Sequence, residues 1–168
     1  MKMPDDLAKA FNDQIVLELE SSLAYLQMAA YFEYASLKGL AAWMRVQSEE
    51  EHAHAMRFFD YVLDRGNAVT LGSPEAPPAD FDSPLSVFRT ALSQEQKVSE
   101  SISTLYAKAS QAADVASFPL LQWFLTEQVE EESTVSEIID QLELIADDGA
   151  ALLLLDRELG TRTTTPAE

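Results

Sequence analysis

Cysteine is absent from this chain of 168 residues. Without thiols there are no disulfide bonds and no thiolate metal sites, so any bound metal must take oxygen and nitrogen ligands. The absence also agrees with a reducing compartment, and we expect a cytoplasmic protein. Glycine is scarce, with only 5 residues, so the points at which a helix can break are few and easy to locate.

Long hydrophobic runs are missing too. The longest, residues 150–155, is about a third of the roughly 18 to 20 residues that a membrane-spanning helix needs. The N-terminal stretch MKMPDDLAKAFND carries a charge every few residues and has no apolar segment of the kind found in secretory signals. We therefore expect neither a membrane span nor a secretory signal.

Basic residues are few: 11 Lys and Arg stand against 29 Asp and Glu, which gives a formal net charge of −18. Such a chain repels nucleic-acid phosphates and anionic lipid surfaces, so we expect no nucleic-acid or membrane partner. Excess acidity either keeps a protein soluble or attracts cations. Composition leaves both interpretations open, and the positions of the acidic residues must decide between them.

Patterns typical of β-strands are absent, because no stretch alternates β-branched and polar residues. Helix periodicity and boundary residues predict helices at residues 5–37, 40–65, 84–112, 117–146 and 150–159. The proline-rich stretch before the third helix is too long for a tight turn between antiparallel neighbours. We therefore predict an all-α four-helix bundle with one long crossover, as a single domain over residues 1–160 with a flexible tail at 161–168.

The helix boundaries rest on a few residues. We expect Gly39 to end the first helix and Gly66 to end the second. Ser83, followed by Pro84, is expected to cap the third helix, and Ser117 to begin the fourth.

Each long helix carries one glutamate in the middle of its apolar face. Residues spaced by three and four positions share a helix face. The four predicted core faces are Phe11, Ile15, Glu18, Ser22, Tyr25 and Ala29; Met44, Ser48, Glu51, Ala55, Phe58 and Val62; Phe88, Leu92, Glu95, Ser99, Ile102 and Tyr106; and Phe124, Gln128, Glu131, Val135, Ile138 and Leu142.

Four carboxylates inside one bundle repel each other strongly, and each is costly to bury as a charge. No lysine or arginine lies on the four faces. A pair of divalent metal ions would supply about four positive charges and match the carboxylates. His54 follows Glu51 by three residues, and a Glu-x-x-His element of this kind places two ligands on one metal in dinuclear carboxylate bundles. The sequence therefore predicts a dinuclear metal centre.

Five segments together resemble the non-haem bacterial ferritins: LELESSLAY, EEEHAHAMRFFDYVLDRGN, SQEQ, LQWFLTEQVEEE and LLLLDREL. The resemblance extends from about residue 7 to residue 160. It implies a ferritin-like bundle with a long B–C crossover and a short fifth helix. It further implies a homo-oligomeric hollow shell of 24 subunits, in which the apolar fifth helix lines the fourfold axis.

The resemblance also implies ligands for two iron ions in each subunit. Glu18, Glu51 and His54 would hold the first iron. Glu95 and Glu131 would hold the second, with Glu51 bridging the two.

Other residues follow from the same resemblance. Gln128 would contact bound oxygen or water, and Tyr25 would donate an electron; the alternative for Tyr25 is an ordinary core aromatic with a bonded hydroxyl. A third iron site would use Glu50, Glu127, Glu130 and Glu131, whereas the alternative is a solvated acidic face.

The chain departs from the haem-binding bacterioferritins. Those relatives carry a second Glu-x-x-His element on the fourth helix, where this chain has Gln128 and Glu131. At the position of their haem-ligating methionine stands His52, and histidine can also ligate haem. An exposed histidine next to the site is the simpler interpretation, so we expect no haem.

We therefore expect an iron storage and detoxification protein. Its ferroxidase activity would oxidise Fe²⁺ to Fe³⁺ with O₂ or peroxide at the di-iron centre, and ferric oxyhydroxide would be deposited inside the shell. Three alternatives stay open: a haem-bearing bacterioferritin, an acidic bundle without catalysis, and a di-iron oxidase that acts on an organic substrate.

Overall fold

The computed structural model describes residues 1–162, which contain helices and no strand. The helices are α1 (Asp5–Tyr34), α2 (Lys38–Asp64), α3 (Pro84–Gln111), α4 (Phe118–Ile145) and α5 (Gly149–Leu159). A single 3₁₀ turn, Val115–Ser117, precedes α4. The all-α prediction, with four long helices and a short fifth one, is confirmed.

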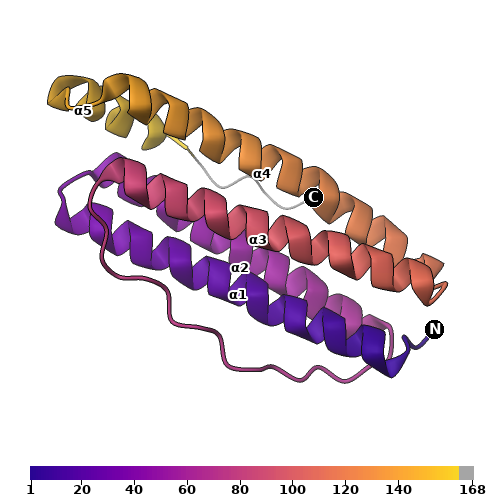
Figure 1. The fold of residues 1–168 in the computed structure, drawn as a ribbon. Helices are drawn as coiled ribbons and strands as arrows, with labels where there is room; N and C mark the ends of the chain where they lie inside the picture. Colours follow the sequence, from indigo (N-terminus) through magenta and orange to yellow (C-terminus); the bar gives the residue numbers. More distant parts are fainter. Residues whose placement is uncertain (163–168) are drawn as a thin grey trace.

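The four long helices form a bundle in which α1 and α2 are antiparallel and α3 and α4 are antiparallel (Figure 1). The crossover between α2 and α3 runs along the outside of α1, from one end of the bundle to the other (Figure 1). Side chains of α1 hold it there: Asn12 accepts a hydrogen bond from the Thr70 amide at 2.9 Å, and Glu20 accepts one from the Glu75 amide at 3.0 Å. The crossover therefore makes α2 and α3 run in the same direction.

Most predicted boundaries hold, and one is wrong. Gly66 lies just beyond α2 with a φ of 74°, and Ser83 caps α3 through a capping box with Ser86. Gly39 does not end α1: α1 ends at Tyr34, and Gly39 lies in the first turn of α2. Gly39 instead allows α2 and α5 to pack closely, because a Cβ at this position would lie 1.6 Å from the carbonyl oxygen of Asp156 in α5.

The predicted start of α4 holds, because Ser117 is the N-cap residue and α4 begins at Phe118. The Ser117 side chain, however, makes no capping hydrogen bond. The Ser117 hydroxyl instead donates to Asp114, which also forms an ion pair with Arg65.

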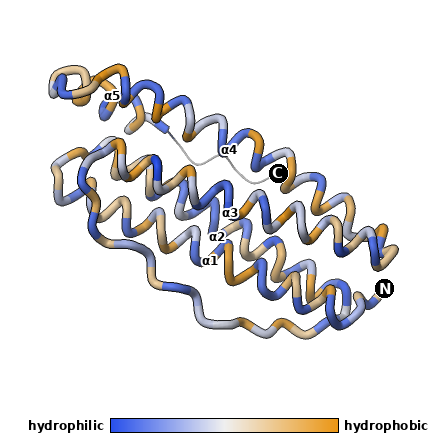
Figure 2. The backbone as a smooth tube through the Cα atoms, viewed as in Figure 1, coloured by the Kyte–Doolittle hydropathy of each residue, from blue (hydrophilic) through white to orange (hydrophobic). Residues whose placement is uncertain are grey.

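The core consists of two apolar clusters with a polar layer between them. The cluster toward α5 contains Phe32, Trp43 and Phe88, and the other contains Phe11 and Phe124. Each large apolar side chain that is fully buried contributes about 1.5 to 3 kcal/mol to stability. Figure 2 shows hydrophobic and hydrophilic residues recurring in turn along every long helix. The clusters thus enclose the bundle's midsection, where the predicted glutamates lie.

The C-terminal end of the described chain packs against the bundle. Asp156 in α5 accepts a hydrogen bond from the Leu40 amide at 2.8 Å, and Arg162 reaches α2. The rest of the predicted flexible tail, 163–168, lies outside the described residues. Among residues 1–162, no helix is both long and apolar enough to cross a membrane.

Candidate metal centre

The polar layer at mid-bundle contains the predicted site residues. The buried ones are Tyr25, Glu18, Glu51, His54, Glu95, Gln128 and Glu131. Glu18, Glu51 and Glu95 have no exposed surface at all. Each of the four long helices therefore contributes one buried glutamate to the same level of the bundle.

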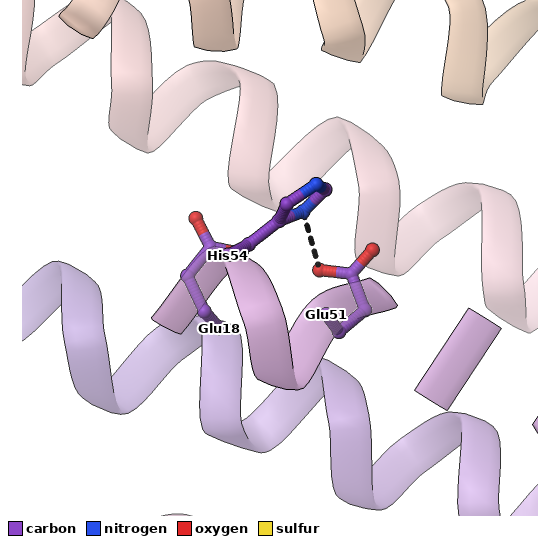
Figure 3. A group of neighbouring side chains, drawn as sticks. All are labelled: Glu18, Glu51 and His54. Carbon is purple, nitrogen blue, oxygen red and sulfur yellow. Dashed lines mark ion pairs between the residues drawn. The ribbon is translucent and has the colours of Figure 1, made fainter. Parts of the chain in front are cut away.

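Three of these residues converge most closely. Glu18 comes from α1, and Glu51 and His54 come from successive turns of α2. One ligand atom of each lies within 4.8 Å of the others. His54 Nδ1 lies 3.5 Å from Glu51 Oε2, and the Glu18 carboxylate rises toward the pair from the neighbouring helix (Figure 3). The Glu51-x-x-His54 spacing thus places both side chains on one side of α2, facing Glu18.

Several buried atoms of these three residues and of the neighbouring Gln128 have no hydrogen-bond partner. They are Glu18 Oε2, both carboxylate oxygens of Glu51, His54 Nδ1 and Gln128 Oε1. A buried polar atom without a partner costs free energy, so native proteins pair nearly all of them. Oxygen and imidazole nitrogen are the ligands that ferrous and ferric iron accept in proteins. The unpartnered atoms therefore fit a divalent metal.

The carboxylates from α3 and α4 are held differently. Glu95 accepts a hydrogen bond from the Tyr25 hydroxyl on one oxygen and from Gln128 Nε2, at 3.2 Å, on the other. Glu131 Oε2 accepts a hydrogen bond from Gln47 Nε2 at 2.9 Å. Within residues 1–162, these two carboxylates do not join a group of three donors as close as the one above.

Burial and mutual repulsion make these carboxyl groups weak acids. Burial, together with repulsion from the adjacent Glu51, raises the pKa of Glu18 to about 8. Burial, followed by repulsion from Glu95, raises the pKa of Glu131 to about 7. The pKa of Glu51 lies well above its usual range for the same two reasons. Burial also raises the pKa of Glu95, although the hydrogen bond from Tyr25 opposes the shift. A cation that replaced these protons would relieve the repulsion.

Two aromatic rings of α4 lie against the imidazole of His54. The rings of Trp123 and Phe124 meet it edge-on, with centroids 5.6 and 5.4 Å away. These rings restrict the orientation of the imidazole and limit the access of water to this side of the group.

The residues predicted for a third site are not gathered in the same way. Glu50 and Glu127 are half-buried, Glu130 is exposed, and Glu131 is buried. Glu50 already has a cationic partner, because Arg162 Nη2 lies 2.7 Å from its Oε2. His52, the residue considered for haem, is exposed.

Sequence reasoning missed three residues that support the centre. Gln14 donates a hydrogen bond to Glu18 at 2.8 Å, Gln47 donates to Glu131, and Arg162 donates to Gln47. A signal for two of them was present: Gln14 and Gln47 each stand four residues before a core-face glutamate, Glu18 or Glu51. No pattern in the sequence indicated Arg162, which lies within the predicted tail.

Comparison with known proteins points in one direction. A family model described as the ferritin-like domain matches residues 8–145. The bacterial non-heme ferritin of Staphylococcus aureus (strain MRSA252) is 41% identical over 158 residues, which are 94% of this chain and 95% of that protein. The bacterial non-heme ferritin of Escherichia coli O6:H1 (strain CFT073) is 37% identical over 159 residues, which are 95% and 96% of the two chains.

Solved structures agree. An engineered closed form of the Archaeoglobus fulgidus ferritin has a TM-score of 0.96 and 44% identity, covering 98% of this chain and 100% of that one. An open pore ferritin from the same archaeon has a TM-score of 0.94 and 43% identity, covering 96% and 98% of the two chains.

Proposed function

This chain belongs to the ferritin family, and we propose that it stores iron after oxidising Fe²⁺ to Fe³⁺ at the mid-bundle centre. The observation that carries the proposal is the set of unpartnered buried atoms on Glu18, Glu51 and His54. A bundle whose acidic residues served solubility alone would keep them at the surface, since buried unpaired carboxylates lower stability.

Iron is the substrate in this proposal, and the protein side chains bind and orient it. Glu18, Glu51 and His54 hold the first Fe²⁺. Glu95 and Glu131 hold the second, and Glu51, whose two oxygens are both free of hydrogen bonds, bridges the ions.

The chemistry is a balanced redox step. Two Fe²⁺ ions give up one electron each, and O₂ takes the two electrons and two protons to form hydrogen peroxide. Peroxide can in turn oxidise two further Fe²⁺ ions as it is reduced to water. Carboxylate oxygens are hard ligands that favour Fe³⁺ over Fe²⁺, so four glutamates and one histidine promote the oxidation.

Two neighbouring side chains have supporting roles. Tyr25 donates its hydroxyl proton in a hydrogen bond to Glu95, which places an oxidisable phenol beside the second iron. Gln128, whose Oε1 has no partner, would orient oxygen or water at the centre.

Storage requires an enclosed space that one bundle does not supply. We propose that 24 copies of the chain form a hollow shell in which ferric oxyhydroxide accumulates. Exposed leucines on the short helix agree with a contact between subunits: Leu153 is 51% exposed and Leu154 is 65% exposed.

An aerobic Fe²⁺ titration of the metal-free protein, followed by near-ultraviolet absorbance, tests the proposal. We expect a fast phase that saturates near two iron ions per chain. A slower uptake should follow, during which hundreds of iron ions stay soluble on each assembled particle. The exposed variant Glu49→Gln provides a matched control, because Glu49 lies two residues before Glu51 on the outward face of α2.

Two other outcomes of this titration would each contradict one part of the proposed function. A fast phase without soluble mineral would indicate a dinuclear oxidase that does not store iron. Oxidation no faster than in buffer would refute the dinuclear centre itself.

A further inference from the structure

Arg162 is the last described residue, and it reaches back to the edge of the metal centre. Its Nη2 forms an ion pair with Glu50 Oε2 at 2.7 Å, and its Nη1 donates a hydrogen bond to Gln47 Oε1. Its guanidinium carbon also lies 4.9 Å from the ring centre of Trp43. Three side chains of α2 thus contact the planar guanidinium. A lysine ammonium, which lacks the planar fork of N–H groups, cannot reproduce all of these contacts.

The docking of α5 accounts for this position. The Asp156 carboxylate accepts a hydrogen bond from the Leu40 amide at the N-terminal end of α2, where a negative charge is favourable. The absence of a side chain at Gly39 and Gly160 lets the two helices approach closely, because a Cβ on Gly160 would lie 2.8 Å from the Gly39 Cα. The chain therefore leaves α5 beside the first turn of α2, and the Arg162 side chain reaches Gln47 and Glu50 further along that helix.

Gln47 connects Arg162 to the centre. Its amide oxygen accepts from Arg162, so its amide nitrogen faces Glu131 and donates to Oε2 at 2.9 Å. Without the arginine, nothing in these contacts prevents the amide from rotating so that its oxygen faces Glu131, where the two oxygens would repel each other. Arg162 thus fixes which end of Gln47 meets the carboxylate.

We propose that Arg162 is a positioning residue for the second metal: through Gln47 it holds Glu131 with Oε2 occupied and Oε1 free to bind the ion. The proposal rests on the proposed function, because it assigns Glu131 to the second metal. Hydrogen-bond partners of metal ligands commonly change metal affinity by 10- to 100-fold. Since Arg162 acts one contact further out, we expect about a tenfold effect.

The sign of the effect separates positioning from simple electrostatics. Removing a positive charge close to an anionic centre strengthens cation binding if only Coulomb forces act. If Arg162 acts by positioning, Arg162→Gln should instead lower the affinity for the second metal ion. Arg157→Gln is the matched control, because Arg157 is an exposed arginine of α5 and the same charge is removed.

An anaerobic Co²⁺ titration, followed by the visible absorption of bound Co²⁺, is the test. In the assembled wild-type protein we expect two ions per chain. In Arg162→Gln the first should bind as in wild type and the second about tenfold more weakly, whereas Arg157→Gln should not weaken either. Arg162→Lys should restore part of the lost affinity. Gln47→Met should also weaken binding of the second ion. Adding Arg162→Gln to it should have no further effect, because Arg162 acts on the centre only through the hydrogen bond from Gln47 to Glu131.

The possible results are distinct. Unchanged or stronger second-ion binding in Arg162→Gln would overturn the proposal. So would a gain of a third ion per chain, because Arg162 would then merely occupy a cation site at Glu50. Additive losses in the double variant would also overturn it. Failure of the wild type to bind two Co²⁺ ions would instead refute the proposed function. Equal thermal unfolding temperatures of the variants would show that the fold is intact.

Discussion

The α1–α2 half of the centre and the α3–α4 half use the same acid, yet they hold it differently. Glu51 on α2 has no hydrogen bond to either oxygen, whereas Glu95 on α3 accepts hydrogen bonds on both. Glu131 on α4 accepts one from Gln47. In the first half, Glu18 Oε1 accepts a hydrogen bond from Gln14, but Glu18 Oε2, both Glu51 oxygens and His54 Nδ1 have no hydrogen-bond partner. The second half consists of carboxylates that the protein already orients.

This difference has consequences for metal binding. The first half gains most from an ion, because an ion satisfies atoms that otherwise have no partner. The second half must share its oxygens between the ion and existing hydrogen bonds, but it loses less conformational freedom when the ion binds. We therefore expect the first site to fill before the second.

Glu51→Gln should have the largest effect, because Glu51 serves both halves. The amide has one oxygen and no negative charge, so bridging is lost. We expect the fast phase of Fe²⁺ oxidation to slow by at least about 100-fold, since a ligand matters more than its hydrogen-bond partners do. Stopped-flow absorbance measures this, with Glu49→Gln as the control. If the oxidation rate fell by less than threefold, the assignment of Glu51 as a ligand of both ions would be wrong.

His54→Ala and Glu95→Gln should separate the two halves. His54→Ala removes a donor of the first site and should weaken the first Co²⁺ by about 100-fold, whereas Glu95→Gln should leave the first ion in place and weaken the second. Isothermal titration with Co²⁺ under anaerobic conditions resolves the two events. If both variants weakened the same event, the assignment of ligands to separate sites would be wrong.

The stability of the metal-free protein should fall as the pH rises from about 5 to about 8. The pKa values of Glu18 and Glu131 are raised to about 8 and about 7 from a usual value of 4.5. The folded state therefore binds more protons than the unfolded state across this window, and stability decreases with pH. Thermal unfolding at several pH values, with and without Zn²⁺, checks this.

The same measurement compares the two forms of the site. Zn²⁺ replaces the protons, so its stabilising effect should grow with pH, and binding should release protons into a weakly buffered solution. If the stability of the metal-free protein rose between pH 5 and pH 8, the raised pKa values of the buried carboxyl groups would be contradicted.

Tyr25→Phe should have the smallest effect. It removes the hydrogen bond to Glu95 and leaves Glu95 Oε1 buried without a partner. The free energy of unfolding should therefore fall by about 1 to 3 kcal/mol. The second Co²⁺ should bind a few-fold more weakly, and the first should be unaffected. Chemical denaturation and Co²⁺ titration measure both, with the exposed Tyr34→Phe as control. An unchanged unfolding free energy would show that the hydroxyl contributes no net stability.

The sequence alone predicted much of this architecture. Helix periodicity and the boundary residues Gly66 and Ser83 located the elements, because such signals act within one or two turns of the chain. The four core-face glutamates and the spacing of Glu51 and His54 indicated a metal centre, since periodicity places such residues on one face before any packing is known.

Tertiary structure decided what depends on distant partners. Gly39 looked like a helix end, yet it serves the approach of Asp156, which is 117 residues away in the chain. The pairing of Gln47 with Glu131 and the return of Arg162 to α2 also depend on how helices pack, and no local pattern encodes them. The composition of the centre was therefore set by the spacing of residues along each helix. The unequal support of its two halves arose only when four helices and the C-terminal segment came together, because hydrogen bonds between distant residues exist only in the packed chain.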